Sequence, residues 1–220
     1  DLINKTKNDI KLFDSVVECG VGRGRSLISL ISILEIIKND FLIKNDQTSK
    51  TDFAISLINS INIYGLDSFE GFPEPSKNDE SEFRNPRRGE WSCSPSKKYL
   101  YTPEFLRNVL KNAGVDFKNV NLIKGFFSES CPKLAKKNPK IGILHCDGDL
   151  YESVRDPLIY LSEHIVKGGI IVFDDFILDE DIKNDFFPGS RIAYEEFHSK
   201  FKDKYHLIKN SRGCAVLQKV

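Results

Sequence analysis

The sequence predicts an α/β fold, a doubly wound, Rossmann-like and mostly parallel sheet of seven strands that ends in an antiparallel C-terminal hairpin. Two observations carry this prediction. Short apolar segments alternate along the chain with segments whose apolar residues recur at helical spacing, which is typical of a parallel sheet covered by helices on both faces. The last two strand-like segments are separated only by Asn210–Gly213, which favours a hairpin.

Each element is expected from its own pattern. Apolar runs predict strands at 14–19, 61–66, 120–124, 141–146, 169–173, 205–209 and 214–218. Helical periodicity predicts helices at 25–38, 128–137, 151–164 and 189–201. A further helix is expected to begin at Pro103, with Thr102 before it. The run KNDQTSKTD at 44–52 is polar throughout and is expected to be a surface connection.

Composition limits the function classes. A chain of 220 residues predicts a single domain, covering residues 1–220. Lys and Arg number 32, as do Asp and Glu, so the net charge of zero argues against binding to nucleic acid or an anionic membrane. Five cysteines without a CxxC pair indicate reduced thiols. With no apolar run long enough for a span and no recognisable signal peptide, a cytoplasmic location is expected.

A glycine-rich segment, ECGVGRG at 18–24, joins the first strand to the first helix. Glycines there permit positive φ and let a ligand approach the backbone, and the helix N-terminus that follows favours an anion such as a carboxylate. A tight turn without a ligand is the plainer alternative. A dinucleotide would need G-x-G-x-x-G and an acid about 20 residues further on. Because Arg25 takes the third glycine position, the spacing favours S-adenosylmethionine over NAD.

The acid that ends the second strand is Asp67, which is much later than a dinucleotide site requires. At the tip of this strand its carboxylate is expected beside the glycine turn, where it can accept hydrogen bonds from both hydroxyls of a ribose. An exposed loop acid is the alternative.

Two acidic segments follow neighbouring strands, HCDGDLY at 145–151 and FDDF at 173–176. The carboxyl ends of parallel strands open onto one crevice, so four carboxylates are expected together there: Asp147, Asp149, Asp174 and Asp175. Like charges at close range need neutralisation, and carboxylate oxygens suit Mg²⁺. Such a metal can bind a substrate hydroxyl and lower its pKa. In the alternative, Asp149 caps the following helix and the Asp174–Asp175 pair lies in solvent.

Together these segments resemble the macrocin O-methyltransferase family. The resemblance is carried by GLDSFEGFPEP, GFFSESCP, LHCDGDLYES, GGIIVFDDF and FPGSRIAYEEF, from about Val16 to Phe197. It implies a class I methyltransferase fold and an Mg²⁺-dependent enzyme that transfers a methyl group from S-adenosylmethionine to a hydroxyl of a small molecule, such as a sugar or an aromatic natural product. It also implies that the chain can form a homo-oligomer.

The resemblance implies roles for individual residues. Asp147, Asp174 and Asp175 match the metal carboxylates, and Asp149 matches the general base. Arg191 is expected either to hold the acidic cluster or to lie on the surface at a helix start. With the glycine turn included, the expected cofactor-binding residues are Glu18, Gly20, Gly22, Gly24, Ser26, Asp67, Ser68, Phe127, Ser128 and Asp147.

The segment from 70 to 102 is rich in proline and charge, and a long loop in a compact domain often forms a lid. We expect a lid or substrate loop at 76–101, called the 76–101 loop below. It carries six basic residues and the only tryptophan, Trp91. It either recognises an acidic or sugar-containing acceptor on which Trp91 stacks, or is a solvated loop with one anchoring aromatic. His145 is expected to be a packed core histidine.

Two other functions stay open at this point. One is an NAD-dependent oxidoreductase on the same kind of sheet. The other is a non-catalytic module that binds the cofactor and transfers nothing.

Overall fold

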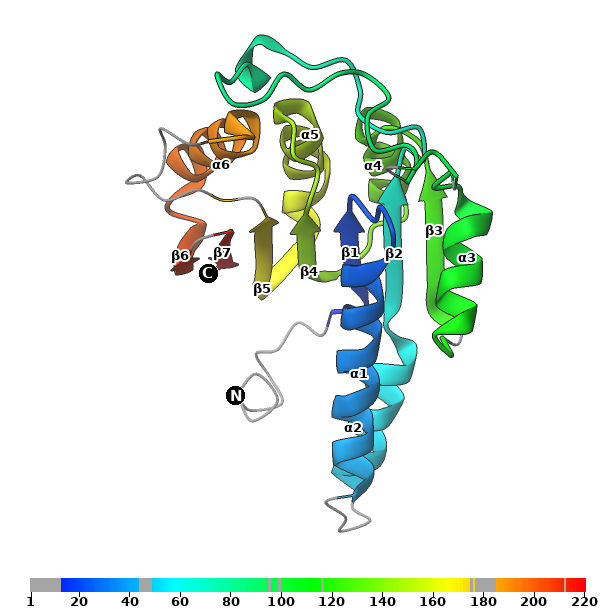
Figure 1. Ribbon diagram of the computed structural model, residues 1–220. Helices are drawn as coiled ribbons and strands as arrows, with labels where there is room; N and C mark the ends of the chain where they lie inside the picture. The colour runs from blue at the N-terminus through cyan, green and yellow to red at the C-terminus, as the bar shows by residue number, and fades with distance from the viewer. Residues whose placement is uncertain are drawn as a thin grey trace.

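The computed structural model describes residues 13–43, 49–94, 96–98, 100–115, 117–174, 176, 185–211 and 213–220. It contains one seven-stranded sheet with the strand order β3-β2-β1-β4-β5-β7-β6 (Figure 1). The strands are β1 (Ser15–Cys19), β2 (Asn62–Asp67), β3 (Val120–Lys124), β4 (Ile141–Cys146), β5 (Ile165–Asp174), β6 (Tyr205–Ser211) and β7 (Cys214–Lys219). The first five are parallel, and β7 pairs antiparallel with both β5 and β6. The predicted fold class is therefore confirmed.

Helices cover both faces of the sheet because each apolar stripe requires a partner. On one face, α4 (Phe127–Ala135), α5 (Tyr151–Leu161) and α6 (Pro188–Phe201) pack on the larger core, which includes Leu134, Leu158 and Phe197. On the other face, α1 (Arg25–Ile43) and α3 (Pro103–Asn112) contribute Leu27 and Leu106 to a second core. Among the described residues, no helix is both long and apolar enough to cross a membrane.

Most local predictions are confirmed within a few residues, including Thr102, whose side chain caps the start of α3 by accepting from the Phe105 amide. The polar run at 44–52 is the exception. Residues 49–52 form the first turn of a further helix, α2 (Ser49–Ser60), whereas 44–48 lie outside the described residues. Polar residues are common in a first helical turn, since the N–H groups there have no partner within the helix. The prediction of a connection through 49–52 was therefore wrong.

The chain between β2 and α3 arches over the carboxyl edge of the sheet, across the ends of α5 and α6, and back (Figure 1). It is not wholly irregular. It contains a 3-10 turn, η1 (Lys77–Asp79), and an antiparallel bridge between Cys93 and Leu100. The other 3-10 turns, η2 (Phe117–Asn119) and η3 (Ser162–His164), precede β3 and β5.

Candidate functional site

The glycine turn after β1 has a backbone that other residues would resist. Gly20, Gly22 and Gly24 have φ values of +97°, +49° and +83°. A Cβ on Gly20 would lie 1.7 Å from the carbonyl oxygen of Asp147, so the glycine lets the turn and the acidic segment after β4 come into contact. The Asp147 amide donates to the Cys19 carbonyl at 2.9 Å. This part of the site is therefore built mostly from backbone.

Gly24 has a different role from its two neighbours. A Cβ there would lie 2.4 Å from the Leu106 side chain of α3. Gly24 does not line the cavity described below. Its expected part in cofactor binding stays a prediction, and the observed contact is with the helix behind the turn.

Asp67 holds the glycine turn in place. One carboxylate oxygen accepts from the amides of Val21 and Gly22, at 3.0 and 2.9 Å. The other accepts from the Phe69 amide at 2.7 Å. A carboxylate has about four acceptor positions, so three are already used within the protein. Asp67 therefore lies beside the turn as expected, with room for about one further hydroxyl.

Glu18 and His145 form a pair beneath the turn. They face each other across β1 and β4, and the His145 Nδ1 lies 3.1 Å from the Glu18 Oε1. Burial disfavours the charged imidazolium, but the hydrogen bond to Glu18 and its charge outweigh this and raise the pKa of His145 above its ordinary value. His145 is thus largely buried and hydrogen-bonded to Glu18, as buried polar side chains usually are.

The second oxygen of Glu18 is the notable feature of this pair. Glu18 is fully buried, and its Oε2 has no hydrogen-bond partner. A buried carboxylate oxygen without a donor is costly. A donor on a ligand, such as an ammonium group, would remove that cost. This orphaned atom below the glycine turn fits the amino-acid part of S-adenosylmethionine.

A cavity of about 460 Å³ opens above these residues. Of the residues expected in the site, those that line it are Gly20, Gly22, Ser26, Asp67, Ser68, Phe127, Ser128, Asp147 and Asp149. Glu18 lies below it, and Asp174 does not line it. Asp175 lies outside the described residues. We call the wall formed by Gly20, Gly22 and Asp67 the glycine-turn side of the cavity.

Asp149 occupies a strained position in this cavity. It is buried, with a φ of +60° that a non-glycine residue seldom adopts. The N-cap residue of α5 is Leu150, which makes no side-chain cap, and the first helical amide is bonded by Asp79 instead. The N-cap position is thus held by Leu150 and not by Asp149 itself. Asp149 is one of the residues that line the cavity.

The side chains that could hold a metal together are not the set of acids expected from the sequence. Among the described residues, the ligand atoms grouped within 4.8 Å of one another belong to Glu18, His145 and Asp147. An imidazole that is already bonded to Glu18 is a poor ligand for Mg²⁺, which prefers oxygen. Asp174 is close enough for its charge to help raise the pKa of His145, as does Asp147. Asp147 and Asp174 thus both act on the same imidazole through their charges, and both offer carboxylate oxygens.

The sequence alone did not single out several cavity residues. Glu90, Ser92 and Tyr101 come from the 76–101 loop and its end, and Glu152, Ser153 and Asp156 from α5. The α5 residues have a signal in the sequence, because positions 152 and 156 share one helical face after the acidic segment. The loop residues have none. We call the wall formed by Glu90, Trp91 and Ser92 the loop side of the cavity.

Trp91 is held by an aromatic cluster. Its ring centroid lies 4.9 Å from that of Phe72 and 5.8 Å from that of Phe187. The Arg84 guanidinium lies 4.9 Å from the Trp91 ring and donates to Glu90 at 3.0 Å. Arg84 is therefore engaged within the loop. This weakens the interpretation of the loop as a basic surface for an acidic acceptor.

Arg191 forms its ion pairs outside the acidic cluster, unlike the first of its two expected roles. Its guanidinium pairs with Asp185 at 3.1 Å and with Glu195 at 2.8 Å. Asp185 is buried and precedes α6. The interactions of Arg191 are thus with the start of its own helix rather than with the acids after β4 and β5.

Comparison with known proteins gives a consistent result. The family described as Macrocin-O-methyltransferase (TylF) matches residues 52–202. An 8-demethyl-8-(2,3-dimethoxy-alpha-L-rhamnosyl)-tetracenomycin-C 4'-O-methyltransferase from Streptomyces olivaceus is 27% identical over 74% of this chain and 53% of its own length. A demethyldecarbamoylnovobiocin O-methyltransferase from Streptomyces niveus is 25% identical over 93% of this chain and 65% of its own. The chain thus spans between half and two thirds of these relatives.

Solved structures agree on the fold. The calicheamicin methyltransferase CalS11 matches with a TM-score of 0.67 and 22% identity, over 93% of this chain and 72% of that one. The O-methyltransferase NovP matches with a TM-score of 0.62 and 21% identity, over 94% and 72%. At these identities the likeness concerns the class I methyltransferase fold alone.

Proposed function

Because the chain belongs to the macrocin O-methyltransferase family, we propose that it is an S-adenosylmethionine-dependent O-methyltransferase. Its acceptor is a hydroxyl of a small molecule, a sugar or a glycosylated natural product. One observation carries the proposal. A single cavity joins the glycine turn and Asp67 to two acids, Asp147 and Asp149, that follow β4.

The cofactor residues each have a physical task in this proposal. The Glu18 Oε2, buried and without a partner, accepts from the ammonium group. The glycine turn brings backbone N–H groups to the carboxylate, and Asp67 accepts from one ribose hydroxyl. Phe127 and Ser128, which also line the cavity, flank the adenine end in this proposal. Bound S-adenosylmethionine supplies an electrophilic methyl group on a sulfonium.

Asp149 is the proposed general base. Asp149 lines the cavity on a backbone in the left-handed region. There it takes the proton from the acceptor hydroxyl as the oxygen attacks. Fixed placement of base and acceptor provides much of the rate enhancement, since proximity removes an entropic cost.

Mg²⁺ is the proposed metal, held by Asp147 and Asp174, with Asp175 as the third expected ligand. It would lower the pKa of the acceptor hydroxyl and orient it.

We further propose a reducing, cytoplasm-like compartment, since all five cysteines are free thiols. Self-association stays a prediction.

Cofactor choice is tested without knowing the acceptor. Calorimetric titrations with S-adenosylhomocysteine and with NADH, side by side, are expected to show binding of the former alone. Binding of NADH alone would overturn the proposal in favour of the oxidoreductase alternative. The family match supports the first outcome.

Metal dependence is tested by Asp174→Asn. The change keeps the shape of the side chain and removes the charge that holds a cation, so we expect transfer of radiolabelled methyl to a panel of glycosides to be abolished. Binding of S-adenosylhomocysteine should stay within about twofold, because Asp174 does not line the cavity. The exposed Asp203→Asn is the matched control. Turnover that survives both EDTA and Asp174→Asn would contradict the metal mechanism.

A further inference from the structure

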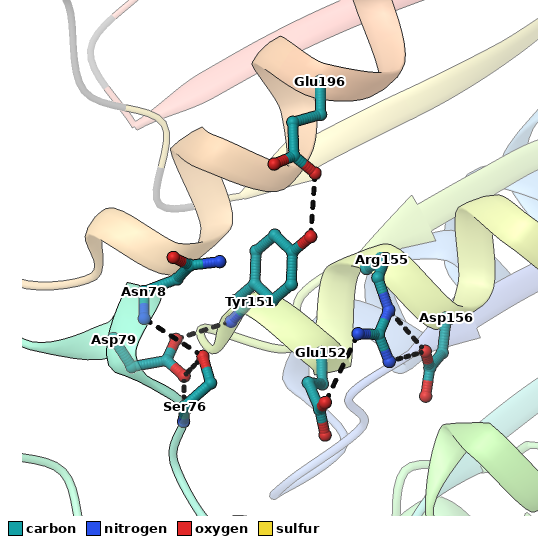
Figure 2. Close-up of polar contacts among 8 residues, drawn as sticks. All are labelled: Ser76, Asn78, Asp79, Tyr151, Glu152, Arg155, Asp156 and Glu196. Carbon is teal, nitrogen blue, oxygen red and sulfur yellow. Dashed lines mark hydrogen bonds and ion pairs between the residues drawn. The ribbon is translucent and has the colours of Figure 1, made fainter.

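The residue at the N-cap of helix α5 has an apolar side chain. Its N-cap residue, Leu150, makes no side-chain hydrogen bond, although the first amides of a helix require acceptors. The missing acceptor comes from far along the chain. The Tyr151 amide donates to the Oδ1 of Asp79, 72 residues away, at 2.6 Å (Figure 2). A carboxylate in this place also interacts favourably with the helix dipole.

The other oxygen of Asp79 organises the 76–101 loop. Its Oδ2 accepts from the amide and the hydroxyl of Ser76, both at 2.7 Å. Asp79 is only 2% exposed. Figure 2 shows its carboxylate between Ser76 on one side and the start of α5 on the other. One buried side chain therefore joins the first turn of the loop to the helix that follows Asp149.

The first turn of α6 forms the remaining wall around this carboxylate. We call the site formed by Ser76, the Tyr151 amide and Gly189 the seat of Asp79. A Cβ on Gly189 would lie 2.0 Å from the Asp79 Oδ1 and 2.5 Å from the Tyr151 nitrogen. Only glycine leaves room there. The Tyr151 hydroxyl donates to Glu196 of α6 at 2.8 Å, so α5 and α6 are also joined to each other (Figure 2).

Further along, the loop is fastened a second time and then reaches the cavity. The Ser81 hydroxyl donates to the carbonyl of Asp185, ahead of α6, at 2.6 Å. Beyond that point, Trp91 packs on Phe187 and lines the cavity with Glu90. The path from Asp79 to the loop side of the cavity is therefore continuous.

From these contacts we propose that Asp79 is a positioning residue that seats the 76–101 loop on the starts of α5 and α6. It thereby places Glu90 and Trp91 at the cavity. The same hydrogen bond holds Tyr151, two residues after Asp149, so seating of the loop and placement of the base share one contact. The catalytic consequence rests on the proposed function, whereas the seating of the loop does not.

The test uses Asp79→Asn in the full chain. An amide has one oxygen and presents its NH₂ group to donors, so it cannot accept from both Ser76 and Tyr151. We expect trypsin to cleave after the exposed Arg87 and Arg88 about tenfold faster, and hydrogen exchange of peptides spanning 76–94 to rise similarly, because charge-assisted hydrogen bonds are lost. Exchange in β1 and β4 should be unchanged.

Gly189→Ala is the second variant, since its Cβ would displace Asp79 from the Tyr151 amide, and press on the Tyr151 backbone, without altering the carboxylate. Asp203→Asn, in the exposed turn after α6, is the control for loss of one charge. Both test variants are expected to keep S-adenosylhomocysteine affinity within about twofold. Both should raise the KM for any glycoside that the enzyme accepts as a substrate.

The possible results separate the two proposals. Unchanged loop cleavage and exchange in both test variants would overturn the seating role. So would global unfolding of Asp79→Asn, because a residue that seats one loop should leave the sheet intact. An enzyme that methylates no glycoside would count against the proposed function only, since the cleavage and exchange readouts need no acceptor.

Discussion

The two sides of the cavity are built in different ways. The glycine-turn side lies at the ends of the neighbouring strands β1 and β2, where the turn is held by backbone hydrogen bonds to β2 and to the segment after β4 and by the carboxylate of Asp67 at the end of β2. The loop side depends on side chains that are distant in sequence, such as Asp79 with Tyr151 and Ser81 with Asp185, 72 and 104 residues apart. Sheet topology thus fixes the first side, whereas a few individual hydrogen bonds fix the second.

This difference predicts unequal responses to mutation. A change on the glycine-turn side should disturb the sheet edge as well as the ligand, because the same backbone serves both. A change on the loop side should alter the recognition of one ligand and leave the sheet intact. The family relation fits this division, since a cofactor shared by relatives needs a fixed site and their different acceptors need a variable one.

The largest effect is expected for Gly20→Ala. Its Cβ would meet the Asp147 carbonyl at 1.7 Å, on a backbone with φ of +97° that alanine resists. Strain and overpacking together should lower the free energy of unfolding by about 2–5 kcal/mol, and S-adenosylhomocysteine affinity should fall more than about tenfold. Urea unfolding and calorimetry measure the two losses.

Gly22→Ala is the matched control for Gly20→Ala. Gly22 also has a positive φ, of +49°, but a Cβ there would meet nothing within 4 Å. Its cost should therefore be about 1 kcal/mol. Equal losses in the two variants would mean that contact with the acidic segment does not set the turn, and the contrast between the two sides would weaken.

The glycine-turn side could be predicted from the sequence because its determinants are local. Apolar runs, the spacing of the glycines and the acids after β2 and β4 specify which residues end each parallel strand, and those ends must meet at one edge. Gly20, Asp67, Asp147 and Asp149 accordingly line one cavity. The pairing of His145 with Glu18 depends instead on the order of the strands, which places β1 beside β4.

The loop side could not be predicted in the same way. Nothing near Asp79 in the sequence indicates that it caps a helix 72 residues later, or that Gly189 leaves space for it. Arg84 illustrates the same limit. Its charge suggested recognition of an acidic acceptor, whereas the fold places it on Trp91 and Glu90. Long-range side-chain contacts depend on packing that no local pattern encodes.

A smaller effect, confined to the acceptor, is expected for Trp91→Ala. Trp91 lines the cavity and is 53% exposed, so removing its ring should cost little stability. The kcat/KM for a glycoside that the enzyme accepts should fall roughly tenfold, equivalent to about 1.4 kcal/mol. The affinity for S-adenosylhomocysteine should stay within about twofold of the unmodified protein's. Steady-state kinetics and calorimetry measure these values.

Phe83→Ala is the control for Trp91→Ala, because Phe83 is a similarly exposed aromatic residue of the same loop that does not line the cavity. It packs against Phe186 at 5.9 Å between ring centroids. If both variants lost the same kcat/KM, the ring of Trp91 would have no specific role at the loop side. If cofactor affinity fell together with kcat/KM in Trp91→Ala, the two sides would not be separable.

The smallest effect is expected for Glu163→Gln, which gives a reference for a long-range carboxylate outside the cavity. Glu163 accepts from Lys204 at 3.2 Å, but both side chains are more than half exposed, unlike the buried Asp79. The hydrogen bond from Lys204 lowers the pKa of Glu163. Its stabilisation is therefore present above the unfolded value of about 4.3 and lost as the pH falls through the lower folded value. At neutral pH the change in the free energy of unfolding should stay below about 0.5 kcal/mol. Urea unfolding at several pH values measures it. A loss as large as that expected for a buried carboxylate would mean that burial does not distinguish such contacts.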